Sequence, residues 1–154
     1  MVNDAKWHEH LGRAYAYWTP HKWFGLRAEY LYERFTRDLE FPITLTNVNT
    51  HRVSLGINFY HPCGLSAMLK GTYVNQHGSF DTQFPSSTGT FTDGDDQFVL
   101  FDAAVSYRLP KRLGFVTMGA KNLFDKSFKY FDMDRANPAI QPGRMVYGKV
   151  TLSF

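Results

Sequence analysis

The sequence has no long apolar run and almost no cysteine. Its longest apolar runs, such as Phe98 to Phe101, fall far short of the roughly 18 residues that a membrane-crossing helix requires. The single cysteine, Cys63, lies in a short turn with Pro and Gly, and it has no partner for an internal disulfide or at zinc-ligand spacing. Any insertion into a membrane must therefore occur through strands.

Charge is sparse as well. Charged residues make up 20% of the 154 residues, the formal net charge is +3, and the basic residues are scattered along the chain. Without a basic stripe, the sequence argues against nucleic-acid binding. Met1–Lys6 lack the apolar core of an export signal, so an exported protein would have lost that signal or would begin upstream of this segment.

Aromatic residues, in contrast, are abundant. They make up 17% of the chain, which is high for a soluble domain but normal where rings line two membrane interfaces. Apolar and polar residues also alternate with period two, the pattern of strands that show different faces to different surroundings. The alternation predicts seven strands: His10–Trp18, Trp23–Arg37, Thr50–Tyr60, Leu65–Gln76, Gln97–Leu109, Gly114–Phe124 and Arg144–Phe154.

The connections between these segments indicate what kind of all-β fold to expect. Short links at 19–22, 61–64 and 110–113 alternate with long ones at 38–49, 78–96 and 125–143. Outer-membrane barrels have this arrangement, with tight periplasmic turns and extended external loops. We therefore predict an antiparallel transmembrane β-barrel rather than a soluble lipocalin-like barrel, which would turn its apolar face inward.

Charged side chains on the polar face support the same choice, because they would be costly in a dry core but not in a wet lumen. They are expected to line one wall, where they could form a cross-strand ladder, a solute path or a docking surface for a plug. The lumen-facing candidates are Arg27, Glu29, Glu33, Arg52, Lys70, Lys121 and Lys149.

The last quarter of the chain carries a more specific pattern. The run Gly119-Ala-Lys-Asn-Leu-Phe-Asp-Lys126 is followed by Pro142-Gly-Arg144 and a closing strand to Phe154. This pattern resembles the C-terminus of TonB-dependent outer-membrane receptors. The rim and motif residues of the resemblance are Asn122, Leu123, Phe124, Asp125, Gly143, Arg144 and Phe154.

The resemblance implies an outer-membrane protein of a Gram-negative bacterium that takes up a scarce solute such as a metal chelate. Its partners would be outer-membrane lipid and the barrel-assembly machinery, which would act on the C-terminal strand. TonB would act through an N-terminal region with a plug, which this sequence does not contain. Independently, Asn122 and Asp125 are expected to bond nearby backbone groups, and Leu123 and Phe124 to anchor the rim.

The orientation follows if the terminal aromatic lies at the periplasmic side, because the short links are then periplasmic and the long ones external. Single-chain bacterial barrels have an even number of strands and closed edges, whereas seven are expected here. Residues 1–154 are therefore interpreted as one segment, the C-terminal part of a larger barrel.

Three other features could carry chemistry, and each has a simpler interpretation. His8-Glu9-His10 could begin a metal site, but no third ligand is evident and an exposed loop end is favoured. Asp93-Gly94-Asp95-Asp96 lacks the pattern of a calcium loop and is expected to be a solvated external turn. No Gly-x-Ser-x-Gly element or paired nucleophile occurs, so we predict no enzyme, no cofactor and no metal site.

Two alternatives stay open at this point. The first is a passive outer-membrane pore or the barrel of a polysaccharide exporter. The second is a soluble β-barrel binding module, which would bury the aromatic face.

Overall fold

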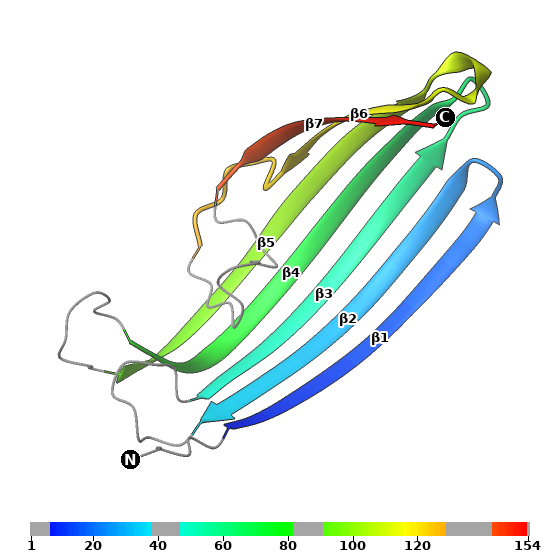
Figure 1. Ribbon diagram of the computed structural model, residues 1–154. Helices are drawn as coiled ribbons and strands as arrows, with labels where there is room; N and C mark the ends of the chain where they lie inside the picture. The colour runs from blue at the N-terminus through cyan, green and yellow to red at the C-terminus, as the bar shows by residue number, and fades with distance from the viewer. Residues whose placement is uncertain (1–6, 38–46, 82–90, 129–142, 154) are drawn as a thin grey trace, which may run out of the picture.

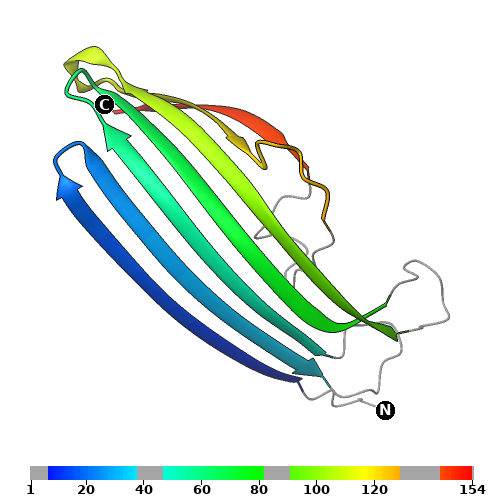
Figure 2. The ribbon, with the colours of Figure 1, turned by 180° about the vertical axis from the view of Figure 1, so that it is seen from behind.

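The computed structural model describes residues 7–37, 47–81, 91–128 and 143–153. Within these ranges the chain forms a single antiparallel sheet in which every strand pairs with its neighbour in sequence. The strands are β1 (Trp7–His21), β2 (Phe24–Arg37), β3 (Asn47–Tyr60), β4 (Leu65–Asp81), β5 (Phe91–Arg108), β6 (Gly114–Lys121) and β7 (Met145–Leu152). β1 to β5 run side by side as long ribbons, and β6 and β7 curl over them at one end (Figures 1 and 2).

The predicted all-β, antiparallel fold with seven meandering strands is confirmed. The sheet is open, since no pairing among the described residues joins β1 to β7. In an antiparallel meander of seven strands the first and the last run in the same direction, so they could meet directly only as a parallel pair. Within the described ranges no helix is long and apolar enough to cross a membrane.

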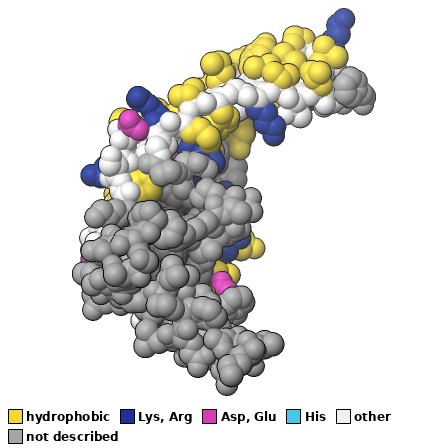
Figure 3. Space-filling view, turned by 60° about the vertical axis from the view of Figure 1, so that its left-hand side comes forward, with side chains coloured by type: hydrophobic (Ala, Val, Ile, Leu, Met, Phe, Trp, Pro, Cys, Tyr) yellow, Lys and Arg dark blue, Asp and Glu magenta, His cyan; other side chains and the backbone are white. Residues whose placement is uncertain are grey.

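The two faces of the sheet differ in chemistry. The cross-strand register places Ala28, Leu55, Gly71 and Phe101 in one row, and the rows on either side of it on this face are also apolar. We call this the outer face. Many of its large side chains are exposed, and Leu55, for example, is 61% exposed. Hydrophobic side chains gather over the upper part of the curved shell in Figure 3.

Aromatic residues border the apolar part of the outer face on two sides. One row lies near the short turns, and a second row lies along β2 and β4, with aliphatic residues between the rows. Each aromatic row spans neighbouring register positions: the first spans three and contains Trp18, Phe24, Phe59 and Tyr107, and the second spans two and contains Tyr30, Tyr32 and Tyr73. Phe24 and Tyr32 are eight residues apart on β2, which corresponds to about 26 Å along the strand.

Beyond the second aromatic row the outer face becomes polar, and the inner face carries buried apolar side chains. His77 and Asp95 form a cross-strand pair on the outer face there, and both are exposed. On the opposite, inner face the same stretch is buried, and Val74 has no exposed surface. The buried hydrophobic residues of the sheet are Leu31, Val48, Val74, Phe98 and Leu100. The ring of Phe128, which follows β6 in the chain, stacks on Phe98 with 4.3 Å between the ring centroids.

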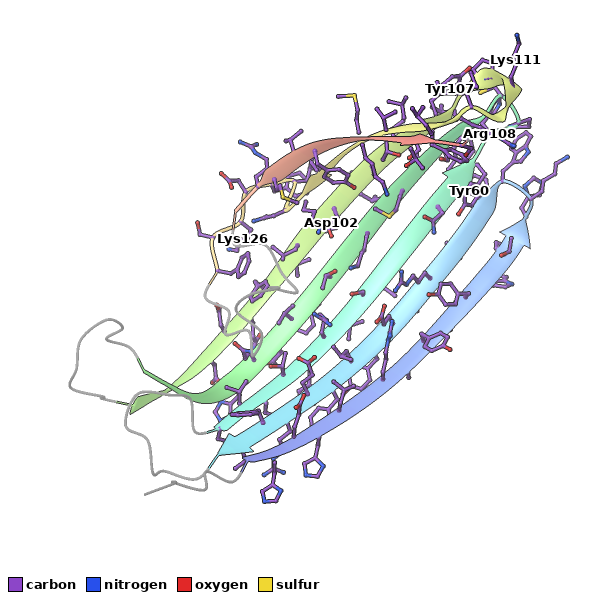
Figure 4. All side chains as sticks on the ribbon, in the orientation of Figure 1. Tyr60, Asp102, Tyr107, Arg108, Lys111 and Lys126 are labelled. Atoms are coloured by element: carbon purple, nitrogen blue, oxygen red, sulfur yellow. The ribbon has the colours of Figure 1, made fainter. Side chains whose placement is uncertain are left out.

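The short connections all lie at one end of the sheet, where Tyr60, Tyr107, Arg108 and Lys111 are found (Figure 4). The turn after β3 is tied to β5, because the Arg108 N–H donates to the Gly64 carbonyl oxygen at 2.9 Å. The link between β5 and β6 contains a 3₁₀-helix, η1 (Pro110–Arg112), and ends at Gly114, whose φ is +135°. A side chain at Gly114 would also collide with β7, so this position requires glycine.

Several predicted boundaries are wrong, chiefly because the strands are longer than expected. β4 continues to Asp81 and β5 begins at Phe91, so most of the predicted loop 78–96 is paired strand. The Asp93–Asp96 segment therefore lies in β5 and is not an external turn. The His8–His10 segment lies in β1 and is not a loop end.

Two further corrections concern the other strands. β1 runs on to His21, past the predicted start of the first short link, with an irregular register between Trp18 and His21. β6 is shorter than predicted and ends at Lys121, because the backbone of Asn122 turns into the left-handed region with φ at +48°. Residues 38–46, 82–90 and 129–142 of the three long connections fall outside the described residues.

Candidate functional site

A hollow of about 300 Å³ lies on the inner face, at the level of the outer-face apolar rows. Strands β2 to β6 supply its lining, so the curvature of the sheet brings together side chains that are up to 95 positions apart in sequence. Its lining consists of Arg27, Glu29, Arg52, Ser54, Lys70, Thr72, Leu100, Asp102, Lys121 and Asn122.

Glu29 is the centre of the ion pairs in this hollow. Arg27, two residues before it on the same face of β2, approaches one carboxylate oxygen at 2.5 Å. Arg13 on β1 reaches the other oxygen at 2.9 Å and also donates from Nε to it. The two guanidinium groups lie 5.5 to 5.7 Å from the ring centroids of Tyr17 and Tyr15. These tyrosines therefore belong to the polar inner face, which explains why alternation in β1 is hard to read.

Three other cations of the hollow make no ion pair within the described part of the chain: Arg52, Lys70 and Lys121. Asp102 lies directly opposite Lys70 in the β4–β5 register. It accepts a hydrogen bond from the Asn122 backbone N–H at 3.0 Å. The lining thus contains four cationic and two anionic side chains, an excess of positive charge.

Neutral polar groups continue across the inner face beside these charges. The hydroxyls of Ser54 and Thr72 are 3.3 Å apart and buried. Further along, the Gln76 amide donates to the Thr50 hydroxyl at 2.9 Å, and both side chains are buried. Arg27 Nε is buried and has no hydrogen-bond partner among the described residues. The hollow therefore offers donors in excess of acceptors.

The structure brings five of the seven predicted lumen residues into this hollow. Glu33 and Lys149 share the inner face but lie outside it. Glu33 pairs with Thr50 toward the long-connection end, and Lys149 pairs with Thr117 on the β6–β7 hairpin. Asp102 lines the hollow and was not among the candidates from the sequence. Its position facing Lys70 and Asn122 depends on the strand register, which the sequence does not reveal.

The Asn122–Lys126 segment closes β6 with a compact turn. The Asn122 side chain accepts from the Lys126 N–H and donates to the Lys126 carbonyl oxygen, both at 2.9 Å, and it is 2% exposed. Asp125 accepts from the Arg144 N–H at 3.0 Å, which ties the turn to the start of β7. These are hydrogen bonds from side chains to backbone groups, as expected from the sequence. Asn122 and Asp125 also adopt positive φ, which Asn and Asp tolerate better than most residues.

The other motif residues have simpler surroundings. The Leu123 N–H donates to the Phe101 carbonyl oxygen at 2.7 Å, which fastens the turn to β5. Phe124 is 71% exposed and packs edge-on against Phe101 of the outer face. Gly143 and Arg144 are exposed and precede β7. Phe154 lies outside the described residues.

The remaining candidates form no further site. His8 and His10 are both exposed and, two residues apart on β1, share one face. Within the described ranges no group of three or more His, Cys, Asp or Glu side chains is placed to hold a metal ion. Cys63 is an exposed free thiol in the turn after β3.

Comparisons of this chain with known proteins gave no match: no family model matches it, and no curated protein or solved structure is significantly similar.

Proposed function

We propose that the chain is part of an outer-membrane β-barrel that takes up a scarce solute such as a metal chelate, in the manner of TonB-dependent receptors. The observation that carries this proposal is the difference in chemistry between the two faces of the sheet. An exposed apolar belt between two aromatic rows covers one face, and a charged, hollowed surface covers the other.

The exposed belt supports contact with hydrocarbon. Contiguous apolar patches on soluble monomers rarely exceed a few hundred square ångströms. Here apolar side chains are exposed on all seven strands, among them Leu55, Leu69, Val105, Met118 and Val150. A soluble binding module would turn this face into a dry core, whereas here its large side chains are exposed and the opposite face carries the charges.

The dimensions of the belt support the same environment. The stretch of about 26 Å along β2 spans about 20 Å across the bilayer at a strand tilt of roughly 40°. This is close to the apolar band of about 25 Å on outer-membrane barrels, which aromatic girdles also border. The exchange of face character beyond Tyr73 then corresponds to strand ends that leave the membrane, with polar residues facing water and apolar residues packed inside.

The uptake part of the proposal rests on the resemblance of the Asn122–Asp125 turn and the following Gly143-Arg144 step to TonB-dependent receptors. A passive pore or a polysaccharide exporter is the second candidate, because a polar hollow would serve either equally well. The open sheet would be completed by further strands, and an odd number of them would allow every pair to be antiparallel.

Cysteine labelling of neighbouring residues tests the membrane assignment. In the full-length protein with Cys63→Ser, single cysteines at Leu69 and Lys70 point to opposite faces of β4. We expect a label on Leu69→Cys to be quenched by nitroxides attached to lipid chains and a label on Lys70→Cys to be protected from them. A label on His77→Cys, on the outer face beyond the aromatic row, is the matched control. Equal quenching at positions 69 and 77 would contradict a lipid-facing belt.

Elemental analysis of cells tests the transport assignment. A strain without the gene and its complemented counterpart are grown with scarce metals, with and without an uncoupler of the inner-membrane proton gradient. We expect the complemented strain to accumulate more of one metal and to lose this advantage with the uncoupler. An advantage that survives the uncoupler would favour a passive pore, and equal metal contents would refute uptake of a metal chelate.

A further inference from the structure

The hollow on the inner face has the composition of an anion site. Its four cationic and two anionic residues leave a surplus of two positive charges. Glu29 is fully engaged, because its two oxygens accept from Arg13 and Arg27. Arg52, Lys70 and Lys121 make no ion pair with any described residue, and Asp102 is the one other carboxylate among the lining residues.

Hydrogen-bond donors in the same place lack acceptors. Arg27 Nε is buried without a partner among the described residues. Ser54 and Thr72 have two hydroxyl protons and share one hydrogen bond, so one O–H remains for a ligand. A carboxylate or phosphate offers several acceptor oxygens and would satisfy these donors, whereas a cation would not.

The size of the hollow suits a small anionic group. The hollow of about 300 Å³ lies at the lower end of the range for small-molecule pockets, roughly 300 to 1,000 Å³.

We infer that this hollow binds the carboxylate or phosphate groups of an anionic solute, with Lys70 and Lys121 as the main charge contacts and Arg52 beside them. The inference deepens the proposed function, on which it rests, by giving the transported solute an acidic character. Asp102, beside Lys70, limits the affinity and so permits release, since a transport path requires binding that is not too tight.

Calorimetric titration of the purified full-length protein in detergent tests this inference, with citrate as the carboxylate probe and inorganic phosphate as the second. Lys70→Met and Lys121→Met keep the length of the side chain and remove its charge. We expect each to weaken binding of the tighter probe about tenfold, the usual scale for one charge-assisted hydrogen bond. Lys149→Met is the matched control, because it removes a lysine from the same face outside the hollow, and it should leave the affinity within about twofold.

Asp102→Asn is expected to act in the opposite direction. Its amide oxygen can still accept from the Asn122 N–H, so the turn is retained while one negative charge is removed from the lining. We expect citrate to bind several-fold more tightly, a gain that partial misfolding of the variant would not produce. Spermidine serves as the cationic probe and should not compete.

The outcomes separate the two proposals. Failure of both anions to bind, or equal weakening by Lys70→Met and Lys149→Met, would overturn the anion site even if energised uptake is observed. Anion binding that follows the expected order of variants would uphold the site even if the uptake experiment shows no dependence on the proton gradient.

Discussion

Replacement of Leu69 by Arg gives the sharpest test of the membrane belt. Leu69 lies on the outer face of β4 and is 48% exposed. Tyr73 in the second aromatic row is four residues further on, and Leu65 at the short-turn end is four residues before it. Each interval is about 13 Å along the strand, or about 10 Å across the bilayer at a tilt of roughly 40°. Leu69 therefore lies near the middle of the proposed belt.

The expected cost differs strongly between the two environments. An arginine at the bilayer midplane of an outer-membrane barrel lowers the free energy of unfolding by roughly 2 to 4 kcal/mol. On a water-exposed surface, a substitution of this kind changes it by only about 0.5 kcal/mol. The difference corresponds to more than about a tenfold change in the folding equilibrium, which is well within reach of measurement.

The assay is reversible denaturant unfolding of the full-length protein in phospholipid vesicles, followed by tryptophan fluorescence. His77→Arg is the matched control, because it lies eight residues along the same face of the same strand and places a cation opposite Asp95. We expect this control to cost at most about 1 kcal/mol. If Leu69→Arg were no more destabilising than His77→Arg, the outer face would not meet hydrocarbon and the argument for a membrane barrel would fail.

Three further predictions concern the turns. Gly114→Ala should lower the free energy of unfolding by more than about 2 kcal/mol, because a Cβ atom would lie 1.8 Å from a β7 carbonyl oxygen. Gly143→Ala is the control and should be nearly neutral in the same unfolding assay, because Gly143 has open space around it. Asn122→Ala should lower the free energy of unfolding by about 2 kcal/mol, because two hydrogen bonds are lost. Asn122→Gly should lower it about 1 kcal/mol less than Asn122→Ala does, since glycine accepts the positive φ. The exposed Cys63 should react with a membrane-impermeant maleimide added to the periplasm but not with the reagent added to intact cells; labelling from outside would reverse the proposed orientation.

The strands were predictable because their signal is local. Alternation with period two depends only on neighbouring residues, and in β2 and β3 it assigned Arg27, Glu29 and Arg52 to one polar face, on which the register places them. The meeting of five predicted lumen residues in the hollow followed from the same alternation, because neighbouring strands of a meander place their polar faces side by side.

The errors arose where the surroundings change along one strand. Beyond Tyr73, β4 continues with polar residues on its outer face and Val74 inside, so a rule that places apolar residues outside ends the strand too early. The partnership of Asp102 with Asn122 depends on register across β5 and β6, and register is a property of the pair of strands. The left-handed turn after Lys121 could have been anticipated from Asn122 and Asp125, because Asn and Asp adopt that conformation more readily than most residues.

The meander described above also has a consequence for the kinetics of assembly. Every ladder joins strands adjacent in sequence, so each pairing step closes only a short length of chain and costs little loop-closure entropy. Proteins with such local contacts fold faster than those dominated by distant pairings. In the proposed barrel, the one distant event would be the meeting of the β1 edge with the rest of the barrel. The seven strands can therefore form hairpin by hairpin from either end. A slow phase in refolding would then report the step in which the β1 edge pairs with the last strand of the proposed barrel.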